Sequence, residues 1–208
     1  MFDRSGNRLL LAAACLAALL FPAHADAHLV TTGLGPVYDG IDHFFLSPGD
    51  GLPVIALALL AGLRGPAAGR RAIWILPVAW LAGGVTGLAM AGRILPPEDA
   101  LDAVSLLLLG ILVAADLSLP ATLVAAIAAL LGALHGFLNG LGFYTAGPGP
   151  ATLQLLGIAV VLFVLVTMTA AAAVTARPLW ARTLVRVVGS WIAASGLLWI
   201  GWVLHGAK

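Results

Sequence analysis

The side chains best suited to chemistry in this chain are histidines and aspartates. Four of the five histidines lie beyond the first 25 residues: His28, His43, His135 and His205. Asp42 directly precedes His43, and Asp39 and Asp50 stand on either side of this pair. Imidazole and carboxylate groups are ligands of divalent transition metals, and a single cysteine excludes a thiolate cluster. These residue types predict a cation site that suits Ni(II), Cu(II), Zn(II) or Co(II) better than Cu(I).

The composition predicts that these residues belong to a membrane protein. Hydrophobic residues make up 62% of the 208 residues, charged residues make up 9%, and the mean hydropathy is +1.08. Such a density predicts transmembrane helices, with room for about six spans of roughly 20 residues and for no separate soluble domain. The chain has no basic stripe that would indicate a nucleic-acid partner. We therefore expect an all-α polytopic protein whose main partner is the lipid bilayer.

The N-terminus has the pattern of a secretory leader. Arg4 and Arg8 precede an apolar run over residues 9–22, and the small-residue signal 23–25 follows. This predicts a signal peptide over residues 1–25 and a single membrane domain over residues 26–208. A second, overlapping signal at 25–27 would place the cut before His28 instead. Either new terminus can bind Cu(II) or Ni(II) through its amine and the His28 imidazole, although the simpler interpretation is a solvated tail.

Six apolar segments follow the leader. The expected spans cover residues 41–63, 72–91, 100–115, 119–139, 151–175 and 183–204. Turn residues separate two pairs of neighbouring spans. Two prolines at 96–97 lie between the second and third spans, and alternating glycines and prolines at 147–150 lie between the fourth and fifth. The link between the third and fourth spans is so short that these two must be antiparallel neighbours.

The charges indicate one orientation of these spans. Leader cleavage would leave the mature N-terminus outside, and six spans would return the C-terminus to that side. Six arginines then lie inside: Arg64, Arg70, Arg71, Arg177, Arg182 and Arg186. This agrees with the positive-inside rule and predicts that both termini of the mature protein lie on the outer side of the membrane. Seven of the eight acids beyond the leader lie on the outer side, where they would concentrate cations.

The first span contains polar residues and helix breakers. Asp42, His43 and Asp50 precede an apolar stretch over residues 54–63 that is too short to cross alone. A span broken by its prolines and glycines would draw Asp42 and His43 to membrane depth, where ionisable groups are costly and indicate function. The alternative is an interfacial loop over residues 35–51 with a solvated Asp42–His43 pair. We favour the broken span.

The fourth span carries the only histidine within a long apolar run. His135 and Asn139 are four residues apart and share a face, and Gly132, Gly136 and Gly140 form a small-residue stripe for close helix packing. A neutral imidazole at this depth can bind a metal, or it can form a helix–helix hydrogen bond. His205 ends the last span beside tryptophans, where an interfacial belt is the simpler interpretation, so it is a minor candidate.

Two short motifs resemble those of the HupE/UreJ family of small bacterial membrane proteins. The family's first motif is a histidine, five residues and Asp-His at the start of the first span. Asp42 and His43 match its end and Gly40 matches its glycine, whereas Pro36 occupies the position of the leading histidine. The resemblance implies nickel as the first candidate metal and metalloenzyme maturation proteins as possible partners.

The second family motif runs Phe-His-Gly, with a further glycine and then a glutamate. His135, Gly136 and Gly140 match it, whereas Leu134 stands in place of the aromatic residue and Gly142 in place of the glutamate. Missing ligands would have to come from elsewhere in the chain, and the candidates are Asp39, Asp50, Asn139 and His28.

Three functions agree with these observations. The first is a permease or capture protein for a divalent metal ion, with Asp42, His43 and His135 as its outer site and with no enzymatic activity. The second is an intramembrane zinc hydrolase, in which two histidines and an aspartate hold a metal with an open position. The third is an accessory or sensing subunit that binds metal without moving it.

Overall fold

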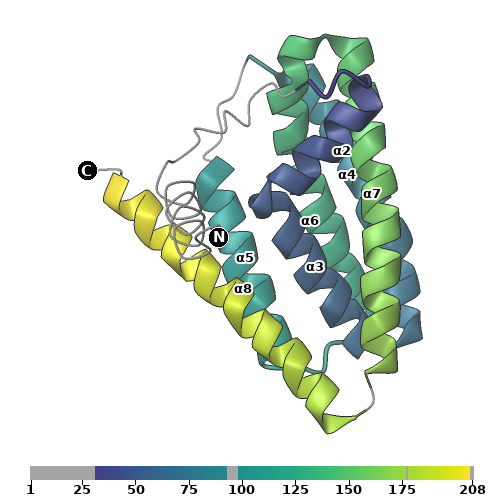
Figure 1. Cartoon of the computed structure of the whole chain (residues 1–208), viewed down its shortest axis with the longest axis vertical. Helices are drawn as coiled ribbons and strands as arrows, with labels where there is room; N and C mark the ends of the chain where they lie inside the picture. Colours follow the sequence, from purple (N-terminus) through teal and green to yellow (C-terminus); the bar gives the residue numbers. More distant parts are fainter. Residues whose placement is uncertain (1–30, 93–97, 177, 207–208) are drawn as a thin grey trace, which may run out of the picture. The chain divides into compact units, whose positions relative to one another are not determined.

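The computed structural model describes residues 31–92, 98–176 and 178–206, and its regular elements there are all helices (Figure 1). In chain order they are α2 (Pro36–Leu46), α3 (Pro48–Leu63), α4 (Pro66–Met90), α5 (Glu98–Ala114), α6 (Ala121–Gly142), the short 3₁₀ helix η1 (Phe143–Ala146), α7 (Pro148–Thr175) and α8 (Leu179–Gly206). The predicted leader, both of its cleavage positions and His28 lie outside the described residues.

Four or five of the six expected spans are long and apolar enough to cross a membrane. Four single helices qualify: Pro66–Met90, Ala121–Ala146, Pro148–Thr175 and Leu179–Gly206. The bent pair of α2 and α3 supplies a fifth. The expected third span corresponds to α5, whose 17 residues extend about 26 Å, a little less than a hydrocarbon core of about 30 Å. The chain is thus a multi-pass membrane protein, and a count of six stays a prediction.

The first span is broken, as the sequence predicts, but the break lies at Ser47. The axes of α2 and α3 meet at 77°, and Ser47 between them has an extended backbone. Proline suits the first turn of a helix, and Pro48 begins α3, which continues through Gly49, Gly51 and Pro53. The expected breakers therefore lie within a helix rather than interrupting one. Residues 36–46, which the alternative assigned to an interfacial loop, form helix α2 instead.

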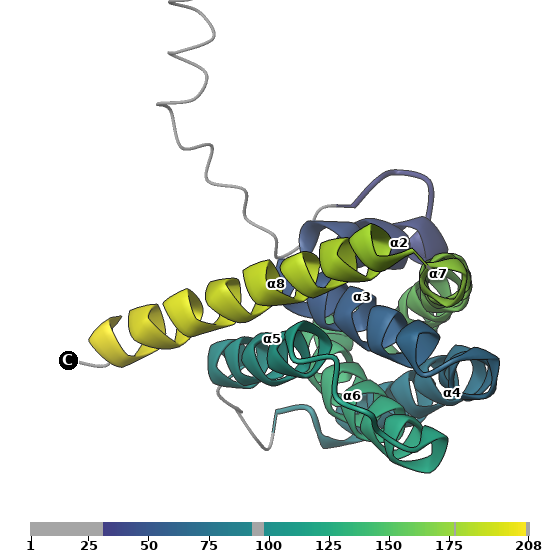
Figure 2. The same cartoon turned by 90° about the horizontal axis from the view of Figure 1, so that it is seen from below.

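Helix α3 is the centre of the bundle. Viewed from one end, α4, α5, α6 and α7 surround it (Figure 2). Its apolar residues Val54, Leu57 and Leu60 are fully buried. A helix that is apolar all round belongs in such a position, whereas an amphipathic one would face lipid or solvent on one side. Because α3 touches helices on every side, polar groups in its first turn face neighbours rather than lipid.

Glycines bring α4 and α6 into backbone contact. A Cβ at Gly136 would meet the Trp80 backbone, and one at Gly140 would meet the backbone of Gly84. At Gly132 the nearest atom would be the Leu76 carbonyl oxygen, at 2.6 Å. The prediction of a small-residue stripe for close packing on this helix is confirmed. This packing fixes the rotation of α6, and therefore the direction in which His135 points.

An ion-pair cluster closes the end of the bundle away from α2. Asp116, in the loop between α5 and α6, accepts hydrogen bonds from Arg64 at the end of α3 and from Arg182 in α8, the latter at 3.0 Å. Arg186 of α8 donates to the Ala114 carbonyl at 2.8 Å. We call this the opposite end, and the end with α2 and the last turn of α6 the site end. The sequence grouped these residues on one side of the membrane, and the structure gathers them at one end.

Candidate metal site

A buried cluster at the site end joins three helices. Asp50 in the first turn of α3, Asp102 in the second turn of α5 and His135 of α6 each offer a ligand atom, and these atoms all lie within 4.8 Å of one another. His135 is 1% exposed and Asp50 is 6% exposed. His135 lies seven residues before the end of α6, about 10 Å along its axis. The cluster therefore lies within the bundle rather than on its surface.

The bend at Ser47 and a glycine position the two carboxylates. Because α3 starts at Pro48, Asp50 lies at its N-terminal end and turns into the bundle. Gly49 faces Asp102 on α5, and a Cβ at Gly49 would collide with the Asp102 carboxylate. The missing side chain at Gly49 thus makes room for Asp102 beside Asp50.

Hydrogen bonds hold the cluster in place. Nδ1 of His135 lies 2.9 Å from Oδ1 of Asp50 and 3.6 Å from Oδ1 of Asp102. Nδ2 of Asn139, one turn further along α6, donates to Oδ2 of Asp50 at 3.0 Å. Nε2 of His135 lies 3.1 Å from Oγ of Ser105 on α5. These contacts orient the His135 ring, the Asp50 carboxylate and the amide nitrogen of Asn139.

Ser105 can select the tautomer that binds a metal. If Nε2 carries the proton and donates it to Oγ of Ser105, the lone pair of Nδ1 faces the two carboxylates. Metal-bound histidines commonly donate their second ring N–H to such a partner, which fixes both ring orientation and tautomer. The ligand atoms would have to approach by a fraction of an ångström, since two ligands about 2.1 Å from one ion lie at most about 4.2 Å apart.

The donor set fits a divalent cation. Two carboxylates this close together, one buried and one partly buried, repel each other and are costly to desolvate, and a doubly charged cation offsets both effects. Oδ1 of Asn139 is buried and has no hydrogen-bond partner in the described part of the chain. An amide oxygen of this kind can serve as a further ligand. Nitrogen and oxygen donors with no thiolate suit borderline metals such as nickel, cobalt and zinc.

The structure brings some of the predicted residues together and leaves others apart. His135, Asp50 and Asn139 belong to the cluster. His43 lies at its edge, where Nε2 is 3.9 Å from Oδ2 of Asp50 and the ring packs edge-on against Phe143 at 4.8 Å.

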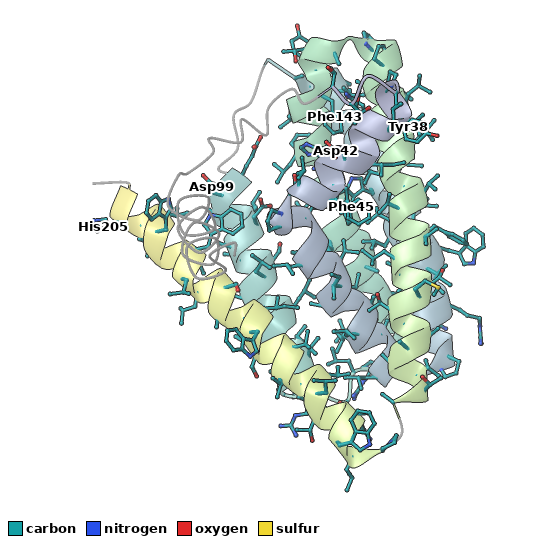
Figure 3. The ribbon with its side chains drawn as sticks, viewed as in Figure 1. Tyr38, Asp42, Phe45, Asp99, Phe143 and His205 are labelled. Atoms are coloured by element: carbon teal, nitrogen blue, oxygen red, sulfur yellow. The ribbon has the colours of Figure 1, made fainter. Side chains whose placement is uncertain are left out.

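The other candidates lie elsewhere. Asp42 is on α2 (Figure 3) and is not among the clustered ligands of the described residues. Asp39 accepts hydrogen bonds from the backbone N–H and the hydroxyl of Thr32, at 2.6 and 2.7 Å. His205 is exposed in the last turn of α8, well apart from the labelled residues of α2 in Figure 3.

Asp102 and Ser105 are not among the residues predicted from the sequence as ligands. Asp102 is one of the seven acids expected on the outer side. A signal was present, because these two residues are three apart on one face of the expected third span, and an acid within a span indicates function.

The fold and the cluster define a class: a multi-pass helical membrane protein with a buried aspartate–histidine group suited to a cation. The family model described as HupE / UreJ protein matches residues 16–199, and the chain belongs to this family. The resemblance inferred from the two motifs is thereby confirmed. HupE/UreJ proteins are membrane proteins associated with nickel or cobalt transport or with accessory functions.

One curated relative supports this assignment. The chain is 29% identical over 136 residues to Protein HupE of Rhizobium leguminosarum bv. viciae. The match covers 61% of this chain and 64% of the relative, so it spans slightly less than two thirds of the relative's length. No solved structure matches the chain.

Proposed function

We propose that this protein captures a divalent transition-metal ion at Asp50, Asp102 and His135 and moves it across the membrane. The single observation that carries the proposal is the convergence of two carboxylates and one imidazole within 4.8 Å of one another, with Asp50 and His135 buried and Asp102 partly buried, in a family that handles metals. Nickel is the first candidate because of the family's association, and cobalt, zinc and copper are the alternatives that the same donors accept.

The path of the ion begins at His43 in this proposal. Its side chain is 27% exposed, whereas that of His135 is 1% exposed, and both approach Asp50. His43 would thus be the first ligand that the ion meets before it reaches the cluster.

The proposal also includes the cellular setting of the protein. It has a cleaved leader over residues 1–25 and lies in a bacterial inner membrane, with periplasmic termini and a site that opens to the periplasm. The ion is delivered to metalloenzyme maturation proteins. Asp42 stays a predicted outer ligand without a place in the cluster.

Metal binding tests the first part of the proposal. Purified protein should bind about one nickel ion per chain, measured by equilibrium dialysis and elemental analysis. The variants Asp102→Asn and His135→Ala should lose most of this metal. Asp99→Asn, three residues from Asp102 on the same helix and exposed, and His205→Ala are matched controls that should keep it. Full occupancy in both cluster variants would refute the site.

A second candidate function follows from the core below the cluster. Between the cluster and the opposite end, the buried residues of α3 and α5 are apolar: Val54, Leu57, Leu60, Leu106, Leu109 and Val113. A polar route for an ion is not apparent among these described residues, which favours an accessory protein that binds metal without transporting it.

Flux measurements distinguish the two functions. Proteoliposomes loaded with a metal-sensitive dye should show nickel entry that depends on His135 if the protein is a transporter. Stoichiometric binding with no flux above that of empty liposomes would instead establish the accessory function.

A further inference from the structure

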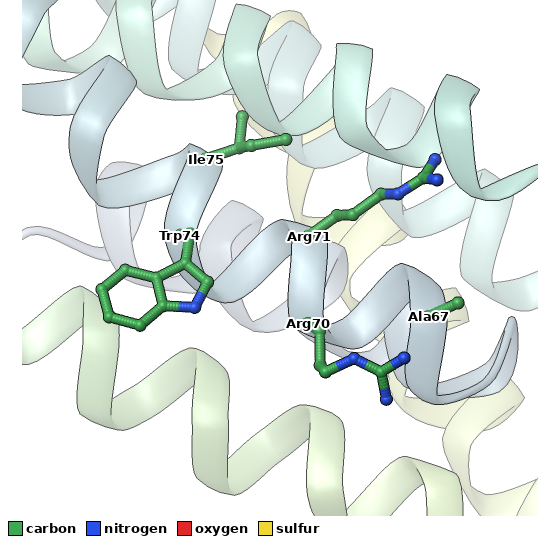
Figure 4. A pocket seen from close by; sticks show the side chains of 5 residues that line it. All are labelled: Ala67, Arg70, Arg71, Trp74 and Ile75. Atoms are coloured by element: carbon green, nitrogen blue, oxygen red, sulfur yellow. The ribbon is translucent and has the colours of Figure 1, made fainter.

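A shallow groove lies at the opposite end of the bundle, remote from the metal site. The first turns of α4 form it, with Ala67, Arg70, Arg71, Trp74 and Ile75 as its lining (Figure 4). In Figure 4 the two arginine side chains extend in the same general direction, away from the indole of Trp74. The groove thus has a cationic part and an aromatic part along one helix.

The two arginines carry charge that the described protein does not neutralise. At this end Asp116 pairs with Arg64 and Arg182, and Arg186 donates to a backbone carbonyl. Neither Arg70 nor Arg71 makes an ion pair or a hydrogen bond to any residue in the described ranges. Two neighbouring guanidinium groups present several N–H donors in planar forks, the geometry that binds phosphate oxygens in pairs.

The aromatic part of the groove continues into an apolar surface. The ring of Trp74, 65% exposed, packs tilted on Phe163 of α7 with 5.2 Å between centroids. Beyond this pair towards the site end, Val78 on α4 and Val160 on α7 are also exposed. Arg70 and Arg71 precede Trp74 by four and three residues, a rise of about 5–6 Å. That step is comparable to the distance between the phosphate level of a bilayer and its acyl boundary, where tryptophan prefers to lie.

We propose that this groove binds the headgroup of an anionic phospholipid. The phosphate would accept hydrogen bonds from Arg70 and Arg71, and an acyl chain would lie along Trp74 and Phe163. Charge complementarity selects this occupant over a second copy of the chain, because two such faces would bring four arginines together. The proposal requires only that the chain spans a bilayer, and it is independent of the metal site.

Lipid titration of the purified full-length protein in neutral detergent tests the proposal. The probes are short-chain phosphatidylglycerol, short-chain phosphatidylcholine and inorganic phosphate, with native mass spectrometry as the readout. We expect one phosphatidylglycerol per chain to bind saturably, and the other two probes to bind at least about tenfold more weakly. Equal binding of the two lipids, or equal binding of inorganic phosphate, would overturn the proposal.

Variants locate the binding to the groove. Arg70→Gln should weaken phosphatidylglycerol binding about fivefold, and Arg70→Gln with Arg71→Gln about twenty-fivefold, since each arginine near an anionic headgroup contributes a factor of about five. Arg182→Gln removes one charge at the same end outside the groove and should leave binding unchanged. An equal loss in Arg182→Gln would show general surface attraction and refute a specific site. A concentration-dependent dimer that Arg70→Gln abolishes, with no selective lipid binding, would also refute it.

Discussion

At the scale of single residues, the chemistry of the cluster depends on which nitrogen of His135 holds the proton. Nδ1 faces Asp50 and Asp102, whereas Nε2 faces only Ser105. A serine hydroxyl can accept a hydrogen bond from one neighbour and donate one to another. In the proposed site Ser105 is therefore a positioning residue, which would act on a metal through His135.

Removing this hydroxyl should weaken metal binding without removing a ligand. Ser105→Ala should lower the nickel affinity about 10- to 100-fold, the usual effect of losing the partner of a metal-bound histidine. Isothermal titration calorimetry of the purified protein measures the change. Ser195→Ala, whose hydroxyl only bonds back to the Trp191 carbonyl of its own helix, is the matched control.

A conservative variant separates positioning from packing. Ser105→Thr keeps the hydroxyl and should retain an affinity close to that of the original protein. An affinity for Ser105→Ala within twofold of the original would contradict the role given to Ser105.

At the scale of helices, glycines decide how closely the helices that carry the site approach each other. Gly49 of α3 leaves space for the Asp102 carboxylate, whereas Gly51, two residues on, has its nearest neighbour at 3.8 Å, the Phe44 carbonyl oxygen. The two glycines share a helical turn and differ in what a methyl group would meet. They therefore form a matched pair for testing the site.

Gly49→Ala should displace Asp102 and impair metal binding. A Cβ there collides with a carboxylate, so the side chain of Asp102 must move away from Asp50 and His135. We expect nickel affinity to fall by at least about tenfold, as for other losses of ligand geometry. Gly51→Ala should bind nickel as the original protein does. Equal nickel affinities in the two variants, measured by calorimetry, would show that the close contact between Gly49 and Asp102 does not position the site.

Gly136→Ala should destabilise the protein. Its Cβ would meet the Trp80 backbone, which cannot rotate away as a side chain can, so α4 and α6 must separate. Overpacking of this kind typically costs about 1–3 kcal/mol. Thermal unfolding in detergent, followed by circular dichroism, should show a lower midpoint for Gly136→Ala than for Gly142→Ala. Gly142 has no neighbour within 4 Å of its added Cβ, which makes it the control for the same helix.

At the scale of the whole molecule, the two ends have different electrostatic roles. The site end holds two carboxylates beside an imidazole. At the opposite end one carboxylate, that of Asp116, forms ion pairs with two guanidinium groups. Asp116 connects α3, the loop before α6 and α8, which are distant in sequence. Asp116 therefore links α3, which carries Asp50, to α8 through its two ion pairs.

Asp116→Asn should loosen this end. The side chain of Arg64 is only 10% exposed, so the loss of its carboxylate leaves a largely buried charge unpaired. We expect the free energy of unfolding to fall by about 3 kcal/mol. This is at the lower end of the range for breaking a buried ion pair, because the side chain of Asp116 is 19% exposed. Asparagine tolerates the left-handed backbone found at Asp116, φ 50°, so the variant tests the charge alone. An unchanged midpoint of thermal unfolding would contradict the prediction.

Much of the architecture could be predicted because it depends on local patterns. Apolar length located the helices to within several residues, since each must satisfy its own backbone hydrogen bonds in lipid. The glycine spacing on α6 predicted close packing, because residues four apart lie on one helical face. The third expected span was located to within two residues, as α5, but its 17 residues are marginal for crossing a membrane, so the pattern predicted the helix more firmly than the crossing.

The sequence by itself determined the membrane class and the family, and it selected His135 as a candidate ligand. Only the tertiary structure decided which acids meet that histidine. Asp50 reaches it because the chain bends at Ser47, and Asp102 reaches it because Gly49 leaves room. Asp42, next to His43 in sequence, is left out of the cluster in the described structure. Ligands of a buried ion must converge within a few ångströms, and that convergence depends on the packing of helices up to 85 residues apart rather than on spacing along one of them.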